Sequence, residues 1–224
     1  MGYLFDQKKC QSDLKNFFAK EKVSINSLGS KVNQTFEANV FAATIRWYES
    51  KGWRTTIVSP FVNGNSQFKL KFNTRGRPSN YSYAVCEKNG ERCQIRHQLR
   101  VSTSSFNPTN SKPANICCDV AVTRDVDVDF YGTGDALPNG DLISFAEAKH
   151  MSAFAELVAS FVGLVHELKP AHLKKVRNRR WKLGDHIPPF LSLSGTMQGT
   201  ATGLAETIEH RKIDIDIYSF DNPV

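Results

Sequence analysis

The sequence has no apolar run long enough to cross a bilayer. The longest, residues 153–165, spans 13 residues and includes Glu156, whereas a transmembrane helix needs about 20 predominantly apolar residues. The first ten residues also lack the apolar core of a signal peptide, and Asp6 stands where a myristoylation signal carries Ser or Thr. These absences predict a cytoplasmic protein.

Cysteine is scarce, and its spacing excludes the common zinc modules. The five cysteines, at positions 10, 86, 93, 117 and 118, form neither a CxxC nor a CxxH motif. Their odd number argues against a disulfide framework. Cys86 and Cys93 flank Asn89-Gly90, a preferred dipeptide for a two-residue hairpin turn, which would set the two thiols directly opposite each other. We predict free thiols there, with a disulfide as the alternative.

The residues that are present describe a globular chain with a local excess of positive charge. Its 224 residues are 40% hydrophobic and 23% charged, which is the composition of one folded domain. Seven of the 29 Lys and Arg residues fall within residues 169–182, which contain no acid, and elsewhere 22 basic residues match 22 acidic ones. Such a cluster favours a polyanion such as nucleic acid, and a solvated loop is the alternative.

Hydrophobic periodicity predicts an α/β fold with a mixed central sheet flanked by helices. Helical spacing covers residues 12–22, 36–51, 152–168 and 203–211, and strand patterns cover 53–58, 68–72, 116–123, 142–149, 190–193 and 213–218. The hairpin around Asn89-Gly90, over residues 81–101, is expected as an insertion in the N-terminal half. We predict a single domain, with residues 1–30 as a helical extension and 36–218 as the core. The helix over 152–168 is apolar on nearly every side, so it should be buried, with Ser152 as its N-cap.

Alternation along the second strand of this hairpin predicts which side chains share a face. It places His97 with Leu99 on an apolar face, where a histidine is more often a core residue than a ligand. Arg96 and Gln98 lie on the other face, with Tyr83 opposite Arg96. That face either follows a phosphate backbone or is simply solvated.

The strand over residues 142–149 ends in two charged side chains. Alternation brings Glu147 and Lys149 onto one face, where they are costly to desolvate unless they pair or hold an ion. Asp119, on the predicted strand 116–123, would complete a cation site, because two carboxylates suffice to hold Mg²⁺. Lys149 would then orient or deprotonate a metal-bound water. The pattern therefore indicates hydrolysis of a phosphodiester.

These residues resemble the PD-(D/E)xK nuclease superfamily, which has the restriction-endonuclease-like fold, over about residues 36–218. The order of helix, Asp-bearing strand, ExK strand and following helix is similar to that of uncharacterised bacterial members. The resemblance implies that Asp119, Glu147 and the Ala148 carbonyl ligate Mg²⁺, for which Mn²⁺ substitutes, and that Lys149 serves the water. It also implies that Glu37 is an auxiliary acid; the alternative is a first-turn residue favoured by the helix dipole.

Three features leave the assignment of the site open. A three-residue ExK match is common by chance, and the chain has a second one at residues 49–51, which we assign to a solvated helix end. Cys118 stands where the family often carries Pro before the acid. Asp127 and Asp129 are alternatives to Asp119 if the hairpin turns at residues 138–140. We favour Asp119 because residues suited to burial follow it along its strand.

By resemblance, the function is that of a Mg²⁺-dependent endonuclease acting on DNA in restriction, anti-phage defence or repair. It would act alone, as a homodimer or with a partner protein. The alternatives are a non-catalytic nucleic-acid-binding module of the same fold and a nuclease that acts on RNA. The basic residues expected to contact nucleic acid are Lys174, Lys175, Arg177, Arg179, Arg180, Lys182, Arg75 and Arg77.

Overall fold

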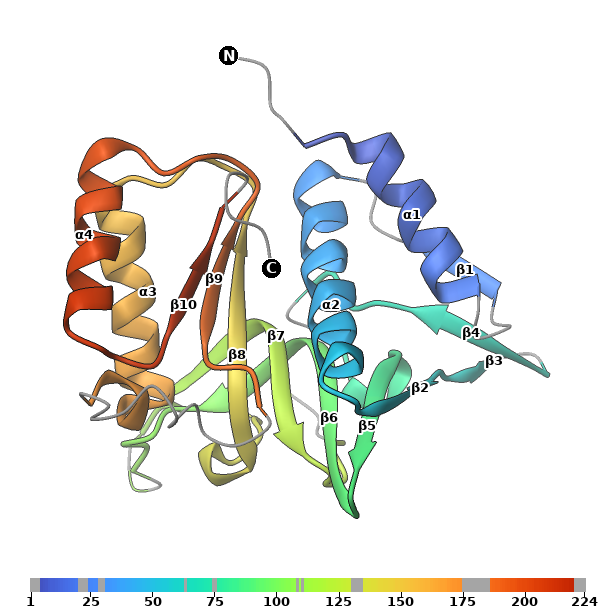
Figure 1. The fold of residues 1–224 in the computed structure, drawn as a ribbon. Helices are drawn as coiled ribbons and strands as arrows, with labels where there is room; N and C mark the ends of the chain where they lie inside the picture. The colour runs from blue at the N-terminus through green and yellow to red at the C-terminus, as the bar shows by residue number, and fades with distance from the viewer. Residues whose placement is uncertain are drawn as a thin grey trace.

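The computed structural model describes residues 5–19, 24–27, 31–62, 64–73, 76–107, 109, 111–129, 135–174 and 186–219. Its centre is a mixed seven-stranded sheet in the order β10–β9–β8–β7–β6–β5–β2 (Figure 1), which confirms the predicted α/β class. Neighbours from β2 to β8 are antiparallel, whereas β8, β9 and β10 run parallel. The strands are β2 (Arg54–Val58), β5 (Tyr83–Lys88), β6 (Glu91–Ser102), β7 (Asn115–Arg124), β8 (Leu142–Lys149), β9 (Phe190–Leu193) and β10 (Asp216–Tyr218). The helices are α1 (Gln7–Ala19), α2 (Val32–Ser50), α3 (Ala155–Leu168) and α4 (Gly199–His210).

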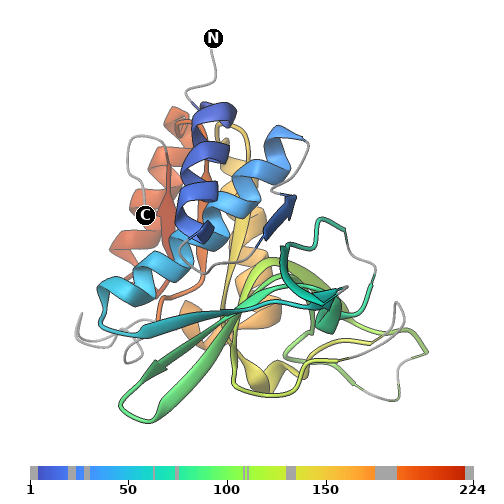
Figure 2. The same cartoon turned by 90° about the vertical axis from the view of Figure 1, so that its right-hand side faces the viewer.

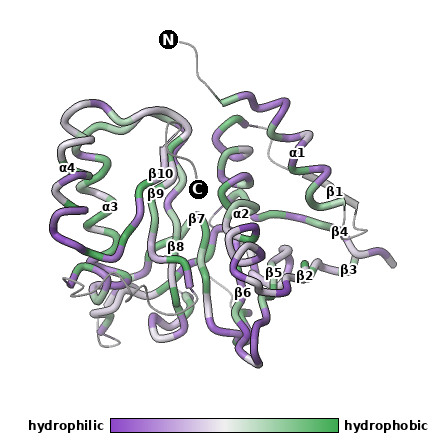
Figure 3. Tube along the Cα trace, viewed as in Figure 1, coloured by the Kyte–Doolittle hydropathy of each residue, from purple (hydrophilic) through white to green (hydrophobic). Residues whose placement is uncertain are grey.

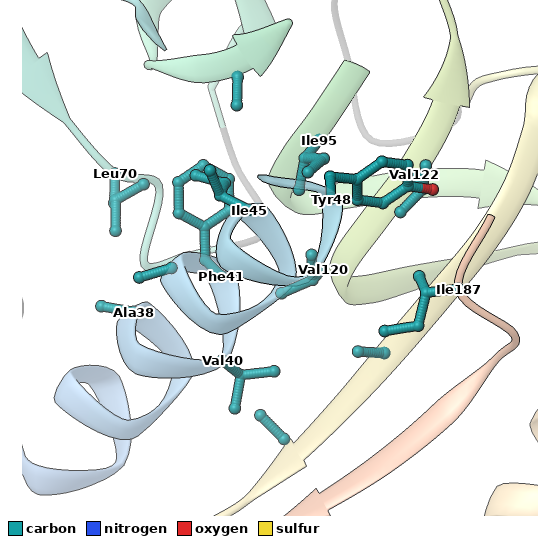
Figure 4. Close-up of a cluster of buried hydrophobic side chains, with 14 of the residues drawn as sticks. Ala38, Val40, Phe41, Ile45, Tyr48, Leu70, Ile95, Val120, Val122 and Ile187 are labelled. Atoms are coloured by element: carbon teal, nitrogen blue, oxygen red, sulfur yellow. The ribbon is translucent and has the colours of Figure 1, made fainter. Parts of the chain in front are cut away.

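The sheet separates two hydrophobic clusters. On one side Phe41 and Ile45 of α2 lie against the strands, close to Ile95 of β6 (Figure 4). On the other side α3 and α4 cover the sheet, and the rings of Phe161 and Phe145 lie 6.0 Å apart. Hydropathy follows this arrangement, because the central strands are mostly hydrophobic and the turn between β5 and β6 is hydrophilic (Figure 3). Burial of apolar side chains on both faces therefore holds the layers together.

The N-terminal helix belongs to the same core. Leu14 and Phe18 of α1 are buried, and the ring of Phe18 stacks on Phe68 at 4.0 Å. The helix packs beside α2 (Figure 2). Next to it a small sheet joins β1 (Ser24–Ser27), β4 (Asn65–Lys69) and β3 (Phe61–Val62) in that order. The segment that we expected to be an extension thus contributes to the hydrophobic core.

Some strand bounds follow the predictions and others do not. β8 and β9 occupy the predicted residues, and β7 is one residue longer at each end, whereas β4 lies three residues before its predicted range and β10 begins at Asp216 instead of residue 213. The helices α1, α2 and α4 each begin four or five residues earlier than predicted. α3 begins at Ala155 instead of Ser152, and its N-cap is Phe154, which has no side-chain cap. The predicted Ser152 cap is wrong because Ala153 forms a β-bridge with Met197, which keeps this segment extended.

α3 is buried along one side only, so the expectation of burial on every side is also wrong. The outer side of the helix carries small residues, which bury little apolar area and can therefore face solvent. The buried residues are Val158, Phe161, Val165 and Leu168, and the exposed small ones are Ala159, Ser160 and Gly163. Among the described residues, no helix is both long enough and apolar enough to span a membrane.

The predicted hairpin forms, but as part of the central sheet and not as an insertion. β5 pairs with β6 through a turn in which Asn89 and Gly90 have φ of 51° and 82°, as a type I′ turn requires. Cys86 lies opposite Cys93, and both are free thiols, as predicted. The hairpin joins the sheet because β5 also pairs with β2, and β6 pairs with β7.

Alternation along β6 breaks at Gln98, whose φ of 52° lies in the left-handed region. Before it, Ile95 packs in the cluster beneath α2; after it, Leu99 and Val101 pack in the cluster beneath α3. A left-handed residue turns the chain, so the side chains that follow it move to the opposite face. The predicted common face of His97 and Leu99 is therefore wrong.

Candidate active site

The candidate site lies where β7 and β8 separate. Their pairing runs as far as Val120 opposite Ala146 and stops there. Asp119, the residue before Val120 on β7, turns its carboxylate towards β8. Its Oδ2 accepts a hydrogen bond of 2.9 Å from the Ala148 N–H. A carboxylate thus satisfies a backbone donor that the strand pairing leaves free. Because the N–H and C=O of one residue in a strand point to the same side, the Ala148 carbonyl also faces this gap.

At the C-terminal end of β8, Glu147 and Lys149 lie side by side, as strand alternation predicts. The Lys149 ammonium contacts Glu147 Oε1, and its Nζ lies 4.0 Å from Asp119 Oδ2. The side chains of Asp119 and Glu147 are only 12% and 15% exposed, whereas that of Lys149 is 36% exposed. The carboxylates are therefore largely shielded from water, and the ammonium remains open to a substrate.

Gln98 links a third carboxylate to this group. Its Nε2 donates to Glu37 Oε2 at 3.0 Å and to Asp119 Oδ1 at 2.9 Å, while Cys117 Sγ donates to Gln98 Oε1 at 3.3 Å. Glu37 comes from the second turn of α2, so the amide joins residues that are 61 and 21 positions away in the sequence. Sequence reasoning missed Gln98, because no local pattern signals a left-handed glutamine within a strand.

The three carboxylates carry more negative charge than Lys149 neutralises. Burial raises the pKa of Glu37 to about 7, and the charge of Asp119 adds to the shift. Burial also raises the pKa of Asp119, against the opposing effect of its bond from the Ala148 N–H. The pKa of Glu147 is raised by burial and by Asp119. Such a concentration of oxygen ligands and negative charge suits a divalent cation.

Lys149 keeps its proton in these surroundings. Burial lowers its pKa, but contact with Glu147 and the charges of Asp119 and Glu37 outweigh that effect and hold the pKa above its ordinary value. Lys149 therefore acts as a hydrogen-bond donor and a positive charge at neutral pH.

His97 lies behind Glu37 and is buried, as predicted for a core histidine. Its Nε2 is 3.6 Å from Glu37 Oε2, which is too long for a hydrogen bond. The ring meets those of Phe41 and Phe72 edge-on. Burial lowers the pKa of His97 to about 4, so the ring is neutral and does not offset the charge of Glu37.

The alternative acids lie elsewhere. Asp129 is bonded to Arg77 and to Ser79, whose Oγ is 2.9 Å from Asp129 Oδ1. Asp127 is exposed, and its negative charge partly offsets the lowering of the pKa of Arg96 by burial. Of the three aspartates weighed from the sequence, the fold brings only Asp119 to Glu147 and Lys149.

The expected nucleic-acid contacts are only partly described. Lys174 is exposed, directly after the short helix η3 (Pro170–Leu173). Arg77 is held in its ion pair with Asp129. The other predicted contacts lie outside the described residues: Arg75, Lys175, Arg177, Arg179, Arg180 and Lys182.

The residues at this site fit a hard divalent cation by the chemistry of their oxygens. Asp119 and Glu147 supply carboxylates, and the Ala148 carbonyl faces the same gap, which matches the preference of Mg²⁺ for a few protein oxygens and several waters. Over the part of the chain that the structure describes, no group of three or more His, Cys, Asp or Glu side chains has the spacing of bound-metal ligands. No family model, curated protein or solved structure matches this chain.

Proposed function

We propose that this chain is a metal-dependent nuclease of the PD-(D/E)xK type, with a divergent restriction-endonuclease-like fold, and that it hydrolyses phosphodiester bonds of DNA. The observation that carries the proposal is the position of Lys149, whose ammonium lies between the carboxylates of Glu147 and Asp119 where two strands separate. The arrangement places a partly exposed cation beside a buried acidic cluster. Such a costly combination is more typical of a catalytic site than of a binding module.

The order of elements supports the fold assignment. A helix with an acid near its start, α2, precedes the antiparallel strands β7 and β8, and the ExK residues close β8. The helix α3 then leads to the parallel strand β9, and α4 leads to β10. This is the order that the resemblance implies over residues 36–218.

Each side chain has a defined task in this proposal. Asp119 is held by the Ala148 N–H and by Gln98, so its orientation is fixed before substrate arrives. Lys149, which stays protonated, donates to the attacking water or to the phosphoryl oxygens and balances charge that develops there. Glu37, with a pKa of about 7, is suited to accept a proton near neutral pH.

Asp119, Glu147 and the Ala148 carbonyl would hold a Mg²⁺ ion, and Mn²⁺ would substitute for it. When bound, such an ion polarises the phosphoryl oxygen and lowers the pKa of a bound water. Burial raises the pKa of both carboxylates, and repulsion by Asp119 raises that of Glu147 further, although Lys149 opposes the rise. A divalent cation would relieve that repulsion, so we expect it to stabilise the fold as well as to support cleavage.

The test is cleavage of nucleic acid by wild type and Lys149→Ala. Supercoiled plasmid, single-stranded DNA and RNA are incubated with Mg²⁺, Mn²⁺ or EDTA, and the products are separated on a gel. We expect cleavage of DNA by wild type with metal, and at least a 100-fold lower rate for Lys149→Ala. The matched control is Lys51→Ala, in the chain's second ExK triplet, where the lysine lies over the Trp47 ring on a solvated helix end.

Each pattern of products selects one function. Metal-dependent cleavage that survives Lys51→Ala and fails in Lys149→Ala supports the proposal. Cleavage of RNA alone moves the substrate to RNA. Binding of nucleic acid without any cleavage favours the non-catalytic module, and equal cleavage by wild type and Lys149→Ala removes Lys149 from the chemistry.

A further inference from the structure

Two cysteines lie directly opposite each other on the hairpin beneath α2. Cys86 of β5 pairs with Cys93 of β6, and both are fully buried in the hydrophobic cluster on the α2 side of the sheet. Lys88 and Glu91 close the two-residue turn as a hydrogen-bonded pair, so the cysteines, two pairs further along, form another. The Cα atoms of such a pair are about 5.5 Å apart, which is a separation that a disulfide spans. The two thiols are therefore within reach of each other without a rearrangement of the strands.

The imidazole of His186 lies over the same face of the hairpin. Its Nε2 is 3.0 Å from Glu91 Oε1, and its Nδ1 is 2.9 Å from the Tyr48 hydroxyl. Glu91 stands two residues before Cys93 on β6, so alternation places both side chains on one face. The ring of Trp53 packs beside the imidazole, with the ring centroids 5.4 Å apart. An acid, a phenol and an indole therefore hold His186 next to the thiols.

The two thiols differ in how readily they ionise. A hydrogen bond from the Cys86 thiol lowers the pKa of Cys93 to about 6, against the opposing effect of burial, and His186 lowers it further. The same hydrogen bond raises the pKa of Cys86, and burial adds to the rise. Burial lowers the pKa of His186, but its contacts with Cys93 and Glu91 outweigh that effect and raise it. At neutral pH the pair is therefore a Cys93 thiolate beside a Cys86 thiol.

The other three cysteines lack this activation. Burial raises the pKa of Cys10 and of Cys117 to about 11, and it also raises the pKa of Cys118. All three are therefore thiols at neutral pH, whereas the thiolate is the nucleophilic form. Cys117 is nevertheless the most exposed of the five, since it is only half-buried. Exposure and ionisation thus favour different cysteines.

We propose that Cys93 and Cys86 are a redox site that hydrogen peroxide, or another small peroxide, converts to a disulfide. The Cys93 thiolate attacks one peroxide oxygen and the O–O bond breaks, which gives a sulfenic acid and releases hydroxide. The Cys86 sulfur then attacks the Cys93 sulfur, and the S–O bond breaks. The departing hydroxide takes the Cys86 proton and leaves as water, so the two sulfurs together give two electrons to the peroxide. This site uses neither the carboxylates nor a metal, and it is independent of the proposed nuclease function.

The surroundings of the pair favour a small oxidant. Neither thiol is exposed, but both lie only two strand pairs from the turn, where the Glu91 side chain is 57% exposed. The end of a hairpin opens more readily than the core of a sheet. Hydrogen peroxide is close to water in size, so it needs only a small opening to reach Cys93.

The experiment oxidises the full chain with a small excess of hydrogen peroxide at pH 7, in EDTA and without nucleic acid. Free thiols are then blocked with N-ethylmaleimide in urea, and tryptic peptides are read by mass spectrometry without reduction. Trypsin cuts after Lys88 and Arg92, so a disulfide between Cys86 and Cys93 joins two separate peptides. A parallel sample contains dimedone, which traps a sulfenic acid.

Two variants are compared with wild type. Cys86→Ser keeps a hydroxyl donor for the Cys93 thiolate but cannot close a disulfide. Cys10→Ser removes a buried thiol of α1 and is the matched control.

We expect wild type and Cys10→Ser to give the linked Cys86 and Cys93 peptides, and dithiothreitol to separate them. Cys86→Ser should give no linked peptides and should carry the dimedone adduct on Cys93. Because Cys117 is protonated, Cys93 should be oxidised at least ten-fold faster than Cys117.

Three results would overturn the redox site. They are oxidation of Cys117 ahead of Cys93, disulfides between two chains in place of the linkage within one chain, and Cys86→Ser without an adduct on Cys93. If Cys86→Ser does not fold, wild type decides alone: the linked peptides support the site, and their absence while Cys117 is oxidised rejects it.

Discussion

Glu37→Gln should make the protein more stable at alkaline pH. Glu37 is the acid whose pKa is raised to about 7 from an ordinary 4.5, first because it is buried and then because Asp119 is charged. A folded-state pKa above the unfolded value means that ionisation at high pH favours the unfolded chain. The difference between the two values, at about 1.4 kcal/mol per pH unit, corresponds to about 3 kcal/mol. Its side chain is only 16% exposed, so solvent screens little of this effect.

The sign of the effect fixes its pH window. Below pH 4.5 Glu37 is protonated in both states and contributes nothing; between 4.5 and 7 the penalty grows; above 7 it is complete. Glutamine has the same shape and still accepts the bond from Gln98. We therefore expect the free energy of unfolding of Glu37→Gln to equal that of wild type at pH 4, and to exceed it by about 3 kcal/mol at pH 8.5.

The assay is urea unfolding in EDTA at pH 4, 5.5, 7 and 8.5, followed by circular dichroism. Glu206→Gln, which removes an exposed carboxylate on α4, is the matched control and should show little pH-dependent difference. The reasoning fails if the gain of Glu37→Gln is the same at pH 4 and pH 8.5. It also fails if the variant is less stable than wild type at pH 8.5, because burial would then stabilise the ionised acid.

Two further predictions test the site and its supports. Gln98→Leu removes the amide that bridges the carboxylates of Glu37 and Asp119, so it should reduce metal-dependent cleavage at least ten-fold. It should also lower the free energy of unfolding by about 1–3 kcal/mol, because buried acceptors lose their donor. Cleavage rates and urea unfolding measure the two effects, and an unchanged rate would exclude a positioning role. Gly195→Ala should destabilise the fold by more than 2 kcal/mol, because its Cβ would lie 2.5–2.9 Å from atoms of Ser152. Gly163→Ala, on the open side of α3, should stabilise the fold by about 0.5–1 kcal/mol. Urea unfolding compares the two variants, and equal effects would contradict the packing around Ser152.

Local patterns were sufficient to predict most strands. β8 and β9 lie where runs of apolar residues predicted them, because such runs are short and bounded by turn residues. The pairing of Glu147 with Lys149 also follows from strand alternation alone. The type I′ turn needed only Asn89-Gly90, since those residues tolerate positive φ.

Pairing between distant strands decided which acid joins the site. Asp119 and Asp129 carry the same carboxylate in similar sequence surroundings, and only the end of pairing at Val120 and Ala146 turns Asp119 towards Ala148. The position of Asp129 depends instead on Arg77, which no spacing in the sequence predicts.

The sequence by itself determined most strands of the central sheet, the hairpin and the adjacent charges at the end of β8, because these depend on neighbours within a few residues. The tertiary structure alone decided the left-handed Gln98, the charge excess around Glu37 and the burial of Lys71. Each of these depends on groups brought together from distant parts of the chain. A pKa, a bridging hydrogen bond and a buried charge are properties of surroundings, and surroundings form only when the chain folds.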